Sequence, residues 1–160
     1  MAATDFRLRH ILALVTGLFL LTQQALAFDP ATLGQVERTA ASLRQDLTRI
    51  QNELSLPTLS SDQLVDLRRL LDDTRASAVG QSAGLNGSFV EVNQQLQSIG
   101  AAPANGSSEP QEIADRRADL VKSLARIKAA QAQLDLIAVE TDQQIDRLTQ
   151  LQRAQFLSRL

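Results

Sequence analysis

The sequence lacks cysteine, tryptophan and tyrosine in all of its 160 residues, and its one histidine is His10. Without cysteine no disulfide can form, so stability must come from side-chain packing. Of the phenylalanines only Phe28, Phe89 and Phe156 lie beyond residue 27, which argues against a thick globular core. Alanine, leucine and glutamine are abundant instead, a composition that favours long helices packed along narrow seams.

Side chains that perform most enzymatic chemistry are also missing after residue 27. No histidine or cysteine is left there for nucleophilic catalysis, metal ligation or proton transfer near neutral pH. Asp72 and Asp73 are adjacent, but neighbouring positions on a helix point about 100° apart and cannot form a catalytic carboxylate pair. We therefore expect a protein that is not an enzyme, with no catalytic, cofactor-binding or metal site and no small-molecule substrate.

Charge excludes a further class of partner. The formal net charge is −2, and no polybasic arm or glycine-rich phosphate loop is present. Binding to nucleic acid, which depends on clustered lysine and arginine, is therefore not expected.

Residues 1–27 have the pattern of a secretory signal peptide. Arg7, Arg9 and His10 form a basic region, an apolar run from Ile11 to Leu21 follows, and Ala25-Leu26-Ala27 is a small-residue cleavage site. The apolar run is shorter than the roughly 20 residues that a membrane-spanning helix needs. We expect export to the periplasm and cleavage after Ala27, with an inner-membrane location if the chain is part of a longer channel protein.

The first helix is predicted over about residues 31–54. Asp29 is a plausible N-cap with Pro30 at the first helical position, and Pro57 ends the helix. Between them, apolar residues alternate in steps of three and four, which is the heptad spacing of a coiled coil. These seam residues are Leu33, Val36, Ala40, Leu43, Leu47, Ile50 and Leu54.

A second helix is predicted over 61–98, with Ser60 and Gln63 forming a capping box and Gly100 as the C-cap. Its seam is predicted to change phase in the middle, as at a coiled-coil stutter, before a flexible tip at 101–109. The seam residues are Leu64, Leu67, Leu71, Thr74 and Ala78, then Leu85, Phe89, Val92, Leu96 and Ile99.

The third helix, over about 111–158, is the longest. Val121, Ile137 and Leu151 are predicted to lie beside its seam. The seam itself comprises Ile113, Leu120, Leu124, Ile127, Leu134, Ala138, Thr141, Ile145 and Leu148.

These lengths predict an all-α fold, an extended antiparallel three-helix coiled-coil-like bundle that thins to a two-helix hairpin. One alternative concerns Gly80, Gly84 and Gly87, since each glycine inside a helix costs about 0.8–1 kcal/mol relative to alanine. A loop near 79–87 would divide the second helix and give four helices. In an unbroken helix the glycines would serve either close helix packing or a hinge.

Three stretches carry a family resemblance: LQSIGAAPANG at 96–106, IADRRADL at 113–120 and RAQFLSRL at 153–160. They resemble the N-terminal periplasmic helical domain, a domain of unknown function, of the large MscS-type mechanosensitive ion channel proteins of alphaproteobacteria. In that family a long helix ends in a leucine-glycine-alanine-proline tip, where this chain has Ile99-Gly100-Ala101-Ala102-Pro103. A helix with an arginine-rich start and a lead-in to the membrane portion follow, matched here by Arg116-Arg117 and by 153–160.

The resemblance implies a non-catalytic sensor or scaffold domain that modulates channel gating or assembly in osmotic or envelope stress. Family members continue into transmembrane helices and a cytoplasmic vestibule, and the 160 residues contain neither, so only the N-terminal part is expected here. Its partner would be the membrane portion of a channel or another envelope protein, and a homo-oligomer is left open. The alternative is a free-standing periplasmic coiled-coil adaptor or chaperone-like protein that binds an envelope partner.

Overall fold

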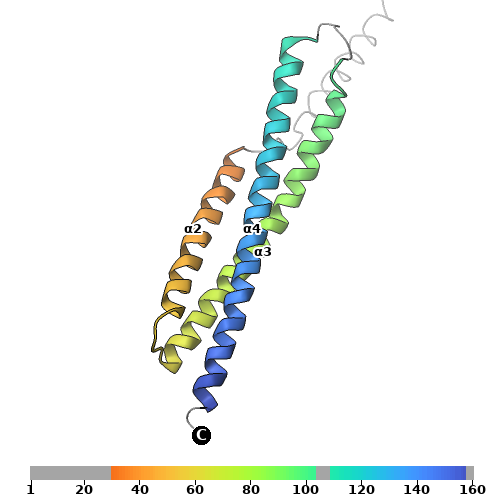
Figure 1. The fold of residues 1–160 in the computed structure, drawn as a ribbon. Helices are drawn as coiled ribbons and strands as arrows, with labels where there is room; N and C mark the ends of the chain where they lie inside the picture. The colour runs from red at the N-terminus through yellow and green to blue at the C-terminus, as the bar shows by residue number, and fades with distance from the viewer. Residues whose placement is uncertain (1–29, 104–108, 158–160) are drawn as a thin grey trace, which may run out of the picture.

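A computed structural model describes residues 30–103 and 109–157, which form three α-helices and no strand (Figure 1). These are α2 (Pro30–Leu54), α3 (Ser61–Ile99) and α4 (Gln111–Leu157). The all-α prediction is confirmed, with each helix within a residue of its expected bounds. The predicted signal peptide, the Asp29 cap, residues 104–108 of the tip and residue 158 lie outside the described residues.

The helix ends follow the predicted capping chemistry. The Gln63 backbone N–H donates to Ser60 Oγ at 3.2 Å, and the Ser60 N–H donates to Gln63 Oε1 at 2.7 Å, so both halves of the capping box are present. At the other end of α3, Gly100 has a φ of 80°, a conformation that glycine adopts with little strain. Its N–H donates to the Gln97 carbonyl at 3.0 Å and closes the helix.

The predicted seam of α2 is confirmed in full. All seven predicted residues are buried, and Leu33, Leu47 and Ile50 are each only 1% exposed. The heptad spacing determines this result because α2 faces both other helices along one stripe.

α3 is a single helix through the three glycines, so the four-helix alternative is wrong. The predicted change of phase is found at one of the two seam positions only. The residues spaced by seven, Leu64, Leu71, Ala78, Leu85 and Val92, keep their phase and are all buried. The second seam position is the one that changes. Every seventh residue from Leu67 onward is Leu67, Thr74, Gln81 and Ser88, so the apolar character is lost after the first of them. Phe89 and Leu96 lie one residue later and are half-buried.

The seam of α4 differs from the prediction at its edges. Ile113 is exposed because it lies beyond the level at which α3 ends, and Val121 is 51% exposed on a flank that neither neighbour covers. Ile137, predicted only beside the seam, is fully buried, and so is Ala130. Leu124, Ala138 and Ile145 are half-buried.

α3 and α4 pair antiparallel along nearly their whole length (Figure 1). Polar contacts spaced by seven residues fix their register: Arg68 with Thr149 at 3.4 Å, Arg75 with Asp142 at 2.6 Å, and Ser82 with Asp135 at 2.7 Å. About one helical turn farther along both helices, four residues from Ser82 and from Asp135, Gln131 donates to Asn86 Oδ1 at 2.9 Å.

α2 is the short helix and covers only the part of the hairpin near the α2–α3 loop (Figure 1). Its ion pairs with α4 are Glu37–Arg126 and Arg44–Glu140. Beyond the first turn of α2, α3 and α4 continue alone, so the molecule is a three-helix bundle that narrows to a two-helix hairpin, as the helix lengths predicted.

Candidate functional site

Three of the carboxylates in the described residues illustrate a structural role, because each pairs with an arginine. Glu140 is paired with Arg44 at 2.8 Å and Asp142 with Arg75 at 2.6 Å, each joining two helices. Asp72 pairs with Arg68 at 3.0 Å within α3. Residues 30–103 and 109–157 contain no group of three potential metal-ligating side chains.

One carboxyl group has a shifted pKa. Two hydrogen bonds from Arg126 to Glu37, at 3.0 and 2.7 Å, hold the pKa of the Glu37 carboxyl below its usual value. The same hydrogen bonds raise the pKa of Arg126. Both side chains are about 40% exposed. The pair links the N-terminal part of α2 to α4, so its role is structural.

The described surface gathers exposed apolar side chains at one end of the bundle. Phe156 is 64% exposed, Leu157 68% and Val65 62%. They come from the last turn of α4 and the first turns of α3, which lie together because the two helices are antiparallel. Leu56, in the α2–α3 loop at the same end, is 53% exposed. We call this surface, comprising Leu56, Val65, Phe156 and Leu157, the Phe156 end.

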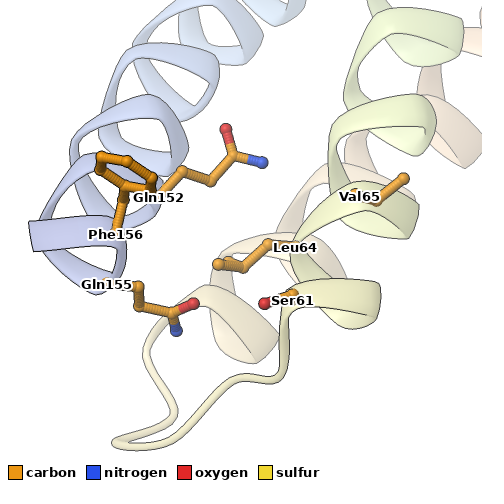
Figure 2. A pocket seen from close by; sticks show the side chains of 6 residues that line it. All are labelled: Ser61, Leu64, Val65, Gln152, Gln155 and Phe156. Carbon is orange, nitrogen blue, oxygen red and sulfur yellow. The ribbon is translucent and has the colours of Figure 1, made fainter. Parts of the chain in front are cut away.

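A pocket of about 260 Å³ opens in this surface between α3 and α4 (Figure 2). Leu64, which is 1% exposed, lies between the two helices, with Phe156 on the α4 side. Ser61, Gln152 and Gln155 supply polar groups around it. An apolar interior with a few polar groups suits an aliphatic or aromatic side chain of a partner protein.

The surroundings of the pocket are held in place by a hydrogen bond from Gln155 Nε2 to the Leu59 carbonyl at 2.7 Å. This contact ties the end of α4 to the α2–α3 loop. A second hollow of about 290 Å³ lies beside that loop and is lined by Leu56, Leu59, Leu67 and Leu70 together with Glu53, Gln63 and Asp66. At the Phe156 end, α4 thus contacts the loop that connects α2 to α3.

The sequence analysis predicted no site residues and therefore did not identify this surface. A signal was present, since the seam of α4 passes through Leu148 and reaches Gln155 seven residues later, which leaves Phe156 and Leu157 off the seam. Apolar residues off the seam of an amphipathic helix are expected to be exposed. What the sequence did not provide was the position of Val65 next to them, which depends on the register of the two helices.

Comparisons of the chain with protein-family models, curated proteins and solved structures give no match. None of the three helices in the described residues has an apolar stretch that would let it cross a membrane.

Proposed function

We propose that this protein is a non-catalytic helical scaffold or sensor domain of the bacterial periplasm that binds a membrane-channel portion or another envelope protein through the Phe156 end. The observation that carries the proposal is the clustering of exposed apolar side chains at that end. The resemblance to MscS-type channel proteins supports the same assignment, because their lead-in to the membrane portion corresponds to residues 153–160.

Geometry offers a physical basis for such a role. α4 has 47 residues and extends about 70 Å. A partner held at the Phe156 end would be connected to the α3–α4 tip by two continuous helices. In this proposal, a load or contact at the tip changes the gating or assembly of the partner in osmotic or envelope stress.

Site-specific photocrosslinking in intact cells tests the proposed partner. A photoreactive amino acid at Phe156 should form an adduct with an integral membrane channel protein. The same amino acid at Gln94, which is exposed near the other end of α3, is the matched control and should not. Adducts at both positions, or at neither, would refute docking through the Phe156 end.

The second candidate function is a free adaptor or chaperone-like protein, and the exposed pocket favours it equally. Phe156→Glu separates the two, because a buried charge disrupts an apolar contact. Loss of survival after hypo-osmotic shock would favour the channel-linked role. Normal survival, combined with an adduct to a periplasmic protein, would favour the adaptor.

Export is a separate part of the proposal. Mass spectrometry of the mature protein should find Phe28 at its N-terminus, since cleavage after Ala27 removes the predicted signal peptide. Mature material that retains Met1 would contradict cleavage.

A further inference from the structure

The face of α4 opposite its buried seam is apolar and exposed. Val121, Leu136 and Val139 are 51%, 49% and 54% exposed, although all three are large hydrophobic residues. Alanines occupy the other positions of this face, which are three or four residues apart along the helix. No charged residue therefore interrupts it. We call this surface the outer stripe; it comprises Ala118, Val121, Ala125, Ala129, Ala132, Leu136 and Val139, all exposed.

The other two helices leave the outer stripe uncovered. α3 contacts one flank of α4, through Gln131, Asp135 and Asp142, and α2 contacts the other flank, through Arg126 and Glu140. An amphipathic helix at the surface normally has polar residues on its solvent face. Among the described residues, the seam and both flanks of α4 thus contact another helix, whereas the face that bears the outer stripe does not.

Charged residues of both signs lie beside the outer stripe on its α3 flank. Lys128 precedes Ala132 along α4, and Asp135 and Asp142 follow it, all three of them exposed. Lys128 contacts the Phe89 ring, 5.4 Å from its centroid, and Asp142 pairs with Arg75, but these contacts leave each side chain accessible from outside.

We propose that the outer stripe binds the outer stripe of a second copy of this chain, antiparallel, with Ala132 at the two-fold axis. In this register Lys128 faces Asp135 of the second copy, because both lie on the α3 flank of α4 at nearly equal distances from Ala132. The contact occurs twice by symmetry.

The same register matches large side chains to small ones. Val139 faces Ala125 of the second copy, and Leu136 faces Ala129, so each protruding side chain meets an alanine. Alanine permits close approach of two helices, and alternation of large and small residues lets facing helices interdigitate. A parallel two-fold pair would instead bring the α3 flank of one copy against the α2 flank of the other, so Lys128 and Asp135 would not meet.

The contact is a single helix pair about 42 Å long, from Ala118 to Asp146, which the axis at Ala132 places opposite each other. Such an area lies at the small end of specific interfaces, so self-association is weak, in the micromolar to millimolar range. It is independent of the Phe156 end, and either surface can be disrupted without the other.

Cysteine cross-linking tests the register directly, because the chain has no cysteine of its own. Ala132→Cys should form a disulfide-linked dimer on mild oxidation, since the two Cα atoms at the axis can approach within disulfide range. Ala118→Cys is the matched control: it is an exposed alanine on the same stripe, and its two copies would lie about 40 Å apart. A mixture of Ala125→Cys and Val139→Cys should give the mixed dimer.

Equal cross-linking at Ala118 and Ala132 would overturn the antiparallel register. Absence of any Ala132→Cys dimer up to about 1 mM protein would overturn the self-association itself.

Charge reversal gives a second test by sedimentation equilibrium. Lys128→Glu should weaken the dimer about tenfold, because two facing pairs become repulsive. Asp135→Lys should do the same. The double variant, in which opposite charges face each other again, should recover the affinity of the unchanged protein, and failure to recover would contradict the assigned pairing.

Discussion

Two threonines lie in the core at the same level of the bundle, since Thr74 and Thr141 directly precede the ion-paired Arg75 and Asp142. Each hydroxyl donates to the carbonyl four residues earlier, Thr74 to Leu70 and Thr141 to Ile137, both at 2.7 Å. That bond satisfies the buried hydroxyl without requiring a partner on another helix. The polar atoms therefore remain tolerable in an otherwise apolar seam.

Replacing the Thr141 hydroxyl by a methyl group should do little harm. In Thr141→Val the Ile137 carbonyl keeps its helix hydrogen bond, so the free energy of unfolding should stay unchanged or rise by up to about 1 kcal/mol. Urea denaturation of Thr141→Val measures it. Thr48→Val is the matched control, because Thr48 makes the same bond to Arg44, at 2.9 Å, on the exposed surface. A loss above about 1 kcal/mol in Thr141→Val alone would show that the hydroxyl has another essential contact.

Replacing a seam leucine by alanine should lower the free energy of unfolding by an amount that depends on how deeply the side chain is buried. Leu47 and Leu134 are at most 1% exposed, and their replacement by alanine should each cost about 2–5 kcal/mol of unfolding free energy. Leu124 is only half-buried, so Leu124→Ala should cost clearly less. Gln51→Ala, off the α2 seam, should change stability by less than about 0.5 kcal/mol; equal losses at all four positions would contradict the assigned seams.

The Glu37–Arg126 pair should make stability depend on pH in one direction. Because the folded-state pKa of Glu37 is lowered, its contribution is present above the ordinary glutamate range and is lost as the pH falls below about 4. Glu37→Gln should therefore reduce the urea midpoint at pH 7 but not at pH 3. Arg126→Gln should have the same effect, and the double variant should add nothing further. A pH-independent difference would show that the ion pair is not its source.

At the level of the helix, Gly80, Gly84 and Gly87 are not explained by close packing against residues 30–103 or 109–157. A Cβ atom added at any of them meets no atom of these residues within 4 Å. α3 continues through all three without a break, so the glycines lower its helix propensity without a packing gain in the described part of the chain. Of the two roles considered for an unbroken helix, close packing against the described residues is excluded by this open space.

Alanine at these positions should therefore stabilise α3. Each substitution should raise the free energy of unfolding by about 0.8–1 kcal/mol, the difference in helix propensity, as measured by urea denaturation. Gly100→Ala is the contrasting control, because its φ of 80° disfavours any side chain and should cost about 1–2 kcal/mol. Destabilisation by alanine at 80, 84 or 87 would mean that another molecule or state approaches the backbone there.

The sequence allowed the helices to be predicted well because capping and heptad spacing are local signals. Ser60 with Gln63, Gly100, and the α2 seam from Leu33 to Leu54 were all identified correctly. The α3 seam was also predicted in its residues, since Phe89, Leu96 and Ile99 pack against the core. Its phase changes at one heptad position only, which depends on where the neighbouring helix lies and not on the sequence of α3 alone. The Phe156 end was missed for the same reason, since it is created by two helices meeting.

For the whole molecule, the narrowing from three helices to two should produce a gradient of local stability. Amides of 64–78 and 134–148 lie where three helices pack, whereas those of 92–99 and 113–125 lie in the hairpin alone. Fewer buried contacts lower the free energy of local opening. Amide hydrogen exchange should be at least about tenfold faster in the hairpin, a difference of about 1.4 kcal/mol in opening free energy. Uniform protection along α4 would contradict this gradient.

The same narrowing has a mechanical consequence. A rod resists bending less where its cross-section is smaller, and a two-helix section is more compliant than a three-helix section. If the Phe156 end is held fixed, the molecule becomes a tapered cantilever whose base stays straight while deflection accumulates above Glu37 and Arg126. A small lateral force at the tip would then displace the tip mainly by bending the hairpin, while the stiff base transmits the full bending moment to the attachment at the Phe156 end.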